Sequence, residues 1–268
     1  MPTVIANGIT LGYEQRGSGP PLVLIMGLGA DRSRWEDHVA AFEERFTCLL
    51  VDNRGAGESD APAGSYTTAQ MARDVAGLMA ALGVPRAHVA GISMGSAIAQ
   101  ELALAYPAAV RSLVLISSWA RCDDYMRTLF EHFEHLRRFA PLPDFMTAIQ
   151  LAIYAPAYFN AHLLEMRQGQ ADAVQSPMPV EAFAGQCHAC TSHDTLARLS
   201  QIEQPTLITV GAEDIFTPLW CAAELEAGLP DAVLDIFTGT GHAHHWEMLD
   251  EFNDRVLDFL LSQPEEEY

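Results

Sequence analysis

The chain has 268 residues, 49% of them hydrophobic and 19% charged, which is enough to bury the core of one α/β domain with an insertion or of two small domains. Its 35 acidic residues against 15 basic ones give a formal charge of −20, which argues against binding to nucleic acid or to an anionic membrane surface. All 15 basic residues are arginines, so Schiff-base chemistry and a phosphate-binding lysine are excluded.

The cysteines and the N-terminus bear on the compartment. Residues 1–8 carry no cationic segment and no long apolar stretch, and no apolar run in the chain reaches membrane-spanning length. An odd number of scattered cysteines suits a reducing environment, so we predict a cytoplasmic protein. Cys187-His188-Ala189-Cys190 has metal-like spacing but no second paired cluster, which favours reduced thiols over a zinc site.

Short apolar runs alternate with amphipathic segments along the chain. Val4–Ala6 and Thr10–Glu14 flank Asn7-Gly8, which predicts a hairpin of two antiparallel strands at a sheet edge. Six later runs are mainly apolar or β-branched, as expected of parallel strands covered on both faces: residues 22–26, 47–51, 88–90, 112–116, 206–210 and 232–237. The β-α-β order predicts a doubly wound, mostly parallel, eight-stranded sheet.

Helical patterns lie between these runs. Thr67 and Gln70 form a capping box ahead of a helix that Gly83 ends. From residue 119 to 204 the strand-like runs stop. Apolar residues recur there at helical spacing, with prolines between the segments. We therefore expect one core domain, residues 1–118 and 205–268, interrupted by a helical cap, residues 119–204, over the carboxyl edge of the sheet where open α/β sheets bind ligands.

The pentapeptide Gly91-Ile92-Ser93-Met94-Gly95 joins the run at 88–90 to a helical pattern. A serine on a sharp strand-to-helix turn needs small residues two positions before and after it, although such a short pattern also arises by chance. Serine is a poor nucleophile unless a base takes its proton and an acid orients that base. Asp214 follows the run at 206–210 and His242 the run at 232–237, so candidates come in the order serine, aspartate, histidine.

With these motifs the chain resembles the α/β-hydrolase superfamily over nearly all of its length outside the cap. Four ordered motifs carry the resemblance: Met26-Gly27-Leu28-Gly29-Ala30, Asp52-Asn53-Arg54-Gly55-Ala56-Gly57-Glu58-Ser59, the Ser93 pentapeptide and Gly241-His242. The resemblance implies Ser93 as nucleophile, His242 as general base and acid, and Asp214 as the residue that fixes the imidazole tautomer. The stretch from Asp52 to Ser59 is expected to be architectural.

The same resemblance implies an oxyanion hole made by the backbone N–H groups of Leu28 and Met94. Two positions depart from the family pattern: Met26 stands where a histidine is frequent, and Ser96 stands where a glycine is common. Other candidates for the triad remain open. They are His245 for the base, and Glu213, Asp123 or Asp124 for the acid, the last two because some relatives keep the acid after the sixth strand.

A serine at the elbow, rather than the aspartate of dehalogenases and epoxide hydrolases or the cysteine of dienelactone-type enzymes, favours acyl transfer to water from an ester or lactone. No cofactor or metal is required. In length and cap size the chain is similar to small bacterial esterases and to 3-oxoadipate enol-lactonases. A carbon-carbon bond hydrolase, a perhydrolase and a ligand-sensing receptor are the alternatives of the same fold. The perhydrolase is disfavoured because Leu28 replaces the aromatic residue usual there.

The cap is expected to shape the substrate pocket. Gly27, Trp119, Tyr125, Phe130 and Tyr154 are candidate pocket residues, although most aromatic residues at such spacing belong to the core of a cap. An inward-facing cap arginine would bind a substrate carboxylate, whereas a solvated arginine is the commoner outcome; the candidates are Arg121, Arg127, Arg137 and Arg138. The expected partner is a small ester or lactone, and a homodimer is compatible with the sequence.

Overall fold

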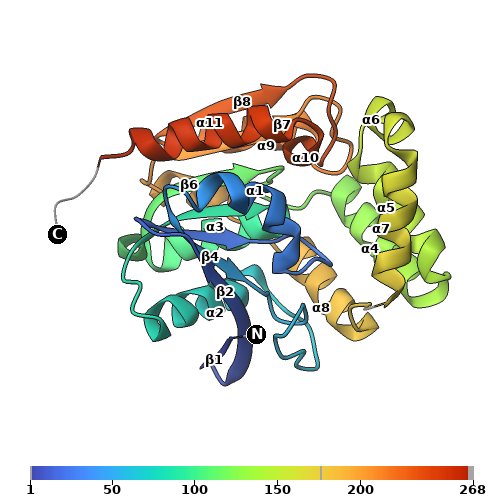
Figure 1. Cartoon of the computed structure of the whole chain (residues 1–268), viewed down its shortest axis with the longest axis horizontal. Helices are drawn as coiled ribbons and strands as arrows, with labels where there is room; N and C mark the ends of the chain where they lie inside the picture. The colour runs from blue at the N-terminus through green and yellow to red at the C-terminus, as the bar shows by residue number, and fades with distance from the viewer. Residues whose placement is uncertain (1, 176, 265–268) are drawn as a thin grey trace.

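The computed structural model describes residues 2–175 and 177–264. Its first two strands, β1 (Thr3–Ala6) and β2 (Ile9–Arg16), form the predicted antiparallel hairpin. Asn7 and Gly8 join them with φ angles of 50° and 77°, as a two-residue turn with left-handed residues requires. The hairpin lies at one edge of an eight-stranded sheet (Figure 1).

The strand order is β1-β2-β4-β3-β5-β6-β7-β8, and every pairing beyond the antiparallel β2·β4 pair is parallel. The strands that follow the hairpin are β3 (Pro21–Ile25), β4 (Thr47–Val51), β5 (Ala87–Ile92), β6 (Val110–Ile116), β7 (Thr206–Gly211) and β8 (Ala232–Phe237). All residues of β5 and β7 are buried because helices cover both faces there. The predicted doubly wound sheet is confirmed.

Two hydrophobic clusters, one on each face, hold the helices on the sheet. Helices α2 (Thr68–Ala81), α3 (Met94–Ala105) and α9 (Leu219–Gly228) supply apolar side chains to the first cluster. Helices α1 (Glu36–Phe42) and α11 (Leu249–Ser262) supply the second cluster. Short helical turns connect elements of the core domain: η1 (Arg32–Trp35), η2 (Pro107–Ala109) and α10 (His244–Glu247).

The start of α2 follows the predicted capping pattern. Thr67 has extended backbone angles, and its side chain accepts a hydrogen bond of 3.1 Å from the Gln70 N–H group. The helix ends at Ala81, and Gly83 adopts a φ of 68° just beyond it. A residue with a side chain would be strained at that angle, so the glycine stops the helix.

In the described part of the chain, five α-helices and the short turn η3 (Leu196–Gln201) lie between β6 and β7, within the stretch that we assign to the cap. The α-helices are α4 (Asp124–Phe139), α5 (Leu142–Ile153), α6 (Pro156–Ala161), α7 (Leu163–Gln175) and α8 (Val180–Thr191). Pro141, Pro156 and Pro179 lie at helix starts, where a missing N–H group costs nothing. In Figure 1, α4 to α7 stand beside one end of the sheet, and α8 leads back to the core. No helix in the described part of the chain is both long and apolar enough to span a bilayer.

Candidate active site

Ser93 occupies a strained turn between β5 and α3. Its φ and ψ are 53° and −115°, a region that a residue with a side chain rarely adopts. A Cβ atom on Gly91 would collide with the Gly95 carbonyl, and one on Gly95 would collide with the Ile25 carbonyl. The spacing of small residues around Ser93 therefore has the steric cause expected from the pentapeptide. The serine side chain reaches the surface only slightly, with 5% of the residue exposed.

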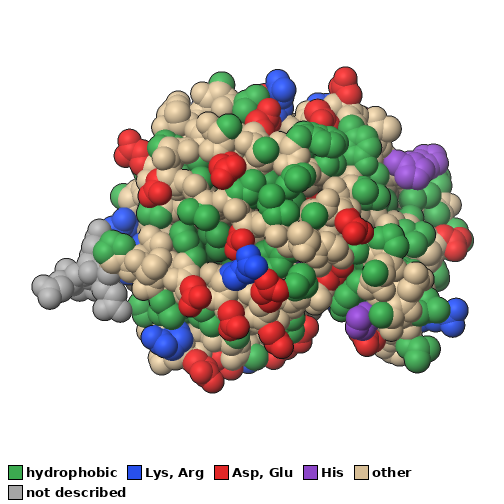
Figure 2. Space-filling view, turned by 90° about the horizontal axis from the view of Figure 1, so that it is seen from above, with side chains coloured by type: hydrophobic (Ala, Val, Ile, Leu, Met, Phe, Trp, Pro, Cys, Tyr) green, Lys and Arg blue, Asp and Glu red, His purple; other side chains and the backbone are tan. Residues whose placement is uncertain are grey.

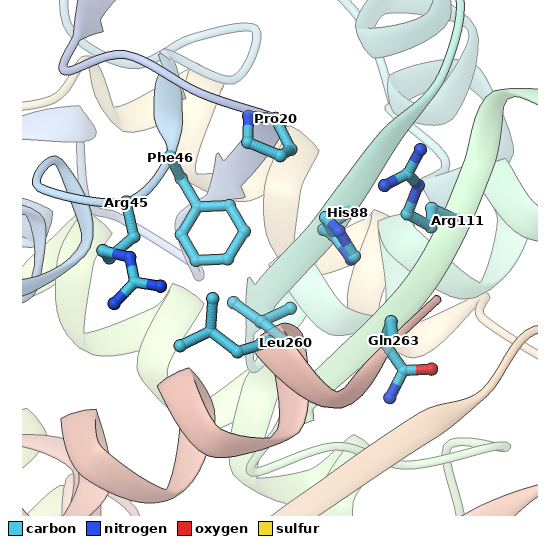
Figure 3. Close-up of a pocket in the computed structure, with 8 residues that line it drawn as sticks. Pro20, Arg45, Phe46, His88, Arg111, Leu260 and Gln263 are labelled. Atoms are coloured by element: carbon cyan, nitrogen blue, oxygen red, sulfur yellow. The ribbon is translucent and has the colours of Figure 1, made fainter. Parts of the chain in front are cut away.

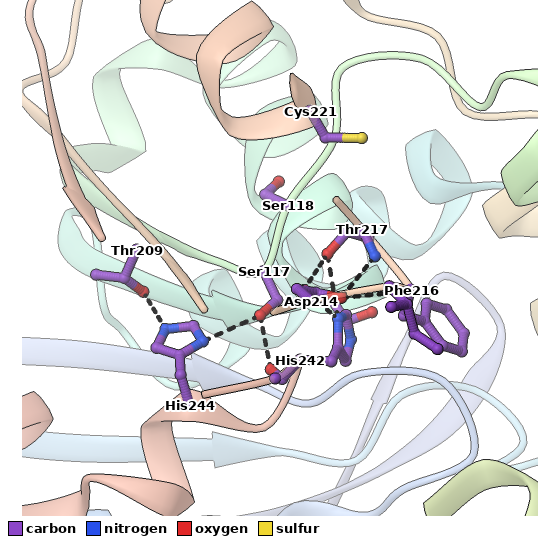
Figure 4. A network of polar contacts seen from close by, with 12 residues as sticks. Ser117, Ser118, Thr209, Asp214, Phe216, Thr217, Cys221, His242 and His244 are labelled. Carbon is purple, nitrogen blue, oxygen red and sulfur yellow. Dashed lines mark hydrogen bonds and ion pairs between the residues drawn. The ribbon is translucent and has the colours of Figure 1, made fainter. Parts of the chain in front are cut away.

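His242 and Asp214 form a buried pair after β8 and β7 (Figure 4). The His242 Nδ1 atom lies 2.8 Å from Asp214 Oδ2. The carboxylate also accepts hydrogen bonds from the N–H groups of Phe216 (2.7 Å) and Thr217 (2.9 Å) and from the Thr217 hydroxyl (2.8 Å). With the Nδ1 proton directed at the carboxylate, the Nε2 atom is left as the acceptor that a general base needs.

The serine turn and the histidine loop are held side by side by the end of β6. The Ser93 N–H group donates to the Ile116 carbonyl at 2.8 Å, and the next residue, Ser117, donates from its hydroxyl to the His242 carbonyl at 2.7 Å. Among the described residues no hydrogen bond joins the Ser93 hydroxyl to the His242 ring. Such a contact is often long in a free enzyme and shortens when substrate is bound.

Ser117 is a supporting residue that sequence reasoning missed. Its φ is 50°, and its N–H group donates to the Thr209 carbonyl at 2.9 Å. His244 packs beside it, with Nδ1 3.3 Å from the Ser117 hydroxyl and Nε2 2.9 Å from the Thr209 hydroxyl. Burial lowers the pKa of His244 to about 3, so this ring is neutral. The only sequence signal was the position of Ser117 directly after a strand, at the edge where ligands bind.

Leu28 lies in the loop after β3, and Met94 directly follows Ser93 at the start of α3. Within residues 2–175 and 177–264, no group accepts a hydrogen bond from the N–H of either residue. A Cβ atom on Gly27 would come within 3.3 Å of the Ser93 Cβ, so the glycine permits the close approach of the loop. The Asn53 amide donates to the Met26 carbonyl at 2.8 Å and fixes the start of the loop.

Both departures from the family pattern have a structural explanation. The Met26 side chain is buried in the second hydrophobic cluster, so it fills space rather than leaving the loop unsupported. The Ser96 hydroxyl donates to the Ser93 carbonyl at 2.5 Å and lies 2.6 Å from the Ser118 hydroxyl. These bonds add support beneath the turn that a glycine would not provide.

The alternative candidates for the acid and the base are placed differently from Asp214 and His242. Glu213 is exposed, whereas Asp214 beside it is buried. His245 is fully buried, its Nδ1 lies 3.1 Å from His38 Nε2, and burial lowers its pKa well below the usual value. Asp123 accepts a hydrogen bond from the Met126 N–H group at 2.8 Å and caps α4, and Asp124 is exposed in the first turn of that helix.

Aromatic rings form a wall beside His242. The Phe216 ring lies 4.8 Å from the imidazole, centroid to centroid, and packs against Phe130 at 5.2 Å and Phe133 at 5.5 Å. Trp119 is fully buried and lies 5.7 Å from Phe130. Phe216 was not among the predicted pocket residues, because it follows β7 and lies outside the expected cap, where the candidate aromatics were sought.

Two predicted pocket aromatics are not part of this wall. Tyr125 is 47% exposed, its hydroxyl donates to the Ile215 carbonyl at 2.6 Å, and its ring packs on the exposed Trp220. Tyr154 is half-buried and stacks on Tyr158 at 5.4 Å.

Of the four cap arginines, two bind groups within the cap and two are exposed. Arg138 pairs with Glu134 and Glu181, and Arg137 donates to the Met178 carbonyl at 2.5 Å. Arg121 and Arg127 are exposed.

The Cys-x-x-Cys pattern lies on α8. Cys187 and Cys190 are buried, and burial raises the pKa of both thiols far above the usual range. His188 turns its Nδ1 to the Tyr66 carbonyl at 3.0 Å. Over the described residues, no three histidine, cysteine or acidic side chains converge in a way that could hold a metal ion.

A small cavity of about 120 Å³ lies at the opposite edge of the sheet (Figure 3). Pro20, Phe46, His88 and Arg111 line it, and each lies at or just before the amino end of its strand. Ser93 follows the carboxyl end of β5, so this cavity is separate from the candidate active site.

Comparisons with known proteins bear on the fold and the family. A family model described as alpha/beta hydrolase fold matches residues 20–249. A relative from Azorhizobium caulinodans, RutD, named as a carbamate hydrolase, is 30% identical over 259 residues, which cover 97% of this chain and 98% of the relative.

Two solved structures are similar over the whole chain. The enol-lactonase from Burkholderia xenovorans LB400 is 27% identical with a TM-score of 0.90, over 97% of this chain and 100% of that chain. A thermophilic esterase from Thermogutta terrifontis is 25% identical with a TM-score of 0.85, over 96% of each chain.

Proposed function

The chain belongs to the α/β-hydrolase family, and from that premise we propose that it cleaves a small carboxylic ester or lactone through an acyl-enzyme on Ser93. The family assignment makes it a hydrolase. The observation that carries the finer proposal is the arrangement at the end of β6, where adjacent residues bind the strained Ser93 turn and the loop of the Asp214-paired His242. An enzyme of this kind needs nucleophile, base and acid at one sheet edge.

In the first half of the proposed reaction, the Ser93 Oγ attacks the carbonyl carbon while His242 Nε2 takes the hydroxyl proton. The carbonyl electrons move to the oxygen, which accepts hydrogen bonds from the Leu28 and Met94 N–H groups. As the carbonyl re-forms, the bond to the alkoxide breaks and the leaving oxygen takes the proton from His242. The buried Asp214 carboxylate stabilises the imidazolium in between.

In the second half, water attacks the acyl-enzyme while His242 takes one of its protons. The tetrahedral intermediate collapses, the Ser93 oxygen leaves with the proton from the imidazolium, and the carboxylic acid is released. The Leu28 and Met94 N–H groups serve both halves of the reaction, because each half passes through a tetrahedral oxyanion at the same place. Removing one such donor costs roughly 10²–10³ in kcat in enzymes of this type.

The charge of the chain bears on the substrate. Acidic side chains are spread over the face seen in Figure 2, in keeping with the formal charge of −20. A field of this sign lowers the local concentration of anions, so neutral esters and lactones are favoured over carboxylated ones. The aromatic wall of Phe216, Phe130 and Phe133 beside His242 favours an apolar group on the substrate.

Carbamate hydrolysis is the second candidate, favoured by the relative RutD, whose name assigns it that activity. A carbamate carbonyl can be attacked by the same serine and stabilised by the same N–H groups. Its nitrogen donates electrons to the carbonyl, so both attack and release of the carbamoyl group are expected to be slower than for an ester of similar size.

The test measures turnover of p-nitrophenyl acetate, butyrate and octanoate, of neutral and carboxylated lactones, and of an aryl carbamate. Multiple turnovers that Ser93→Ala abolishes support the serine hydrolase, and the ratio of ester to carbamate kcat/KM decides between the two candidates. Labelling after a single turnover together with a tight ligand-induced shift would favour a ligand-sensing receptor. Failure on all of these substrates would overturn the ester and lactone proposal and leave the carbon-carbon bond hydrolase or the perhydrolase.

A further inference from the structure

The loop that carries His242 is bound to the cap on both sides of the histidine. On one side, the Ala243 N–H group donates to the Ile153 carbonyl at 2.8 Å. On the other side, a Cβ atom on Gly241 would lie 2.7 Å from the Ile153 carbonyl oxygen and 2.9 Å from the Ala155 nitrogen, so the two backbones touch. The α5–α6 junction of the cap therefore packs directly on the backbone that positions the proposed base.

Glu247 joins these two segments. Its Oε1 atom accepts hydrogen bonds from the Gly241 N–H group at 3.0 Å and from the Ala155 N–H group at 3.1 Å. Its Oε2 atom is buried and has no partner among the described residues. A buried carboxylate oxygen without a partner is unfavourable, and the two hydrogen bonds of Oε1 offset part of that cost. The two bonds of Oε1 tie the cap to the residue before His242.

Gln186 makes the matching connection at the other end of the cap. It lies on α8, is fully buried, and its Oε1 accepts a hydrogen bond of 2.9 Å from the Gly29 N–H group. Its Nε2 donates to the Arg54 carbonyl at 3.0 Å. An amide side chain can accept on one side and donate on the other, as Gln186 does here. Gly29 directly follows Leu28, so Gln186 fixes the orientation of the peptide next to the proposed oxyanion donor.

We propose that Gln186 and Glu247 are positioning residues through which the cap sets the geometry of two loops: the loop after β3, which carries Leu28, and the loop after β8, which carries His242. The inference rests on the proposed function for its effect on rate. Neither side chain is assigned a contact with substrate; each acts through a backbone N–H group. Because misplacement by about 1 Å can cost roughly 10²-fold in rate, loss of either connection is expected to act on kcat rather than on substrate binding.

The experiment compares Gln186→Leu and Glu247→Leu, which remove the hydrogen bonds, with Glu247→Gln, which keeps an acceptor oxygen. Gln150→Leu is the matched control: Gln150 is also a buried cap glutamine, but its Nε2 donates to the Met166 carbonyl at 2.9 Å, within the cap. Each variant is assayed for kcat and KM with p-nitrophenyl butyrate, for Tm, and for backbone hydrogen exchange. Exchange is followed in residues 27–30 and 241–243.

We expect both leucine variants to lose about ten-fold or more in kcat with KM changed by less than about three-fold. Exchange should rise at residues 27–30 in Gln186→Leu and at residues 241–243 in Glu247→Leu. Glu247→Gln and Gln150→Leu should keep the kcat of the unaltered protein. The proposal is overturned if the leucine variants keep their kcat, or if Gln150→Leu loses as much kcat at a similar fall in Tm.

Failure of the proposed function is separately visible. If the unaltered protein turns over none of the substrates, the ester, lactone and carbamate proposals fail, and hydrogen exchange alone decides the positioning roles. Unchanged exchange at residues 27–30 and 241–243 in the two leucine variants would then overturn those roles.

Discussion

The buried histidine on α1 makes the stability of the protein depend on pH. His38 is fully buried, its Nδ1 lies 2.7 Å from the Asn253 side-chain oxygen, and its Nε2 lies 3.1 Å from His245 Nδ1. Nδ1–H donates to Asn253, so Nε2 must accept from the Nδ1–H group of His245. A proton on Nε2 would put two donors face to face. Burial lowers the pKa of His38 to about 4, against weaker opposing effects of the hydrogen bond to Asn253 and of the nearby Asp37.

The sign follows from proton linkage. Between pH 6.5 and pH 4 the unfolded chain binds a proton at this position and the folded chain does not, so stability falls as the pH falls through this range. Below pH 4 both states are protonated and the loss levels off. For His38 alone the loss is about 2 kcal/mol at pH 5 and about 3 kcal/mol at pH 4.

The measurement is urea unfolding at pH 7 and pH 5 for the unaltered protein and for His38→Gln, whose amide can donate to Asn253 and accept from His245. We expect the variant to be less stable at pH 7 and to close the gap by about 2 kcal/mol at pH 5. His132→Gln, at an exposed position on α4, should run parallel to the unaltered protein. A gap for His38→Gln that stays constant within about 0.5 kcal/mol between the two pH values would refute the reasoning.

Three further changes test single contacts. Asp214→Asn should lower kcat/KM by roughly 10⁴ by favouring the wrong imidazole tautomer, measured with the best ester found; a loss under ten-fold would contradict the triad. Ser117→Ala should lower kcat by about ten-fold, whereas Ser112→Ala, a buried serine at the other end of β6, should not; equal rates for the two variants would count against support of the histidine loop. Asp74→Ala should cost about 3–5 kcal/mol of unfolding free energy in urea, because it leaves Arg54 buried without its partner at 2.7 Å; a cost under about 1 kcal/mol would contradict this.

The fold could be predicted because its determinants are local. Continuous apolar runs mark the central strands β5 and β7, which are covered on both faces. The turn residues Asn7-Gly8 and the cap residue Thr67 act within a few positions of themselves. The signal for the Ser93 turn is also local, because the two glycines that the turn requires, Gly91 and Gly95, lie within five consecutive residues. The predicted positions of the hairpin, the parallel strands and the turn therefore agree with the structure.

The supporting residues could not be predicted because their partners are distant in sequence. Gln186 binds a backbone group 157 positions away, and Ser117 binds one 125 positions away. In both cases the partner is a peptide group, which every residue has, so no side-chain pattern indicates the contact. Tyr125 illustrates the related difficulty in the cap: its position on α4 is helical, but the direction of that face depends on how the helix packs.

The strand order explains why the end of β6 matters although this strand carries no triad candidate. Ser93 follows β5, Asp214 follows β7 and His242 follows β8, and the order β5-β6-β7-β8 puts β6 between the proposed nucleophile and the other two. Neighbouring strands lie about 4.8 Å apart, so the loop after β8 must cross about 14 Å to reach Ser93. It passes over the end of β6. There the Ser117 hydroxyl donates to the His242 carbonyl, and the Ile116 carbonyl accepts from the Ser93 N–H group. The strained φ of Ser117 is consistent with a residue held in place by the two loops that it joins.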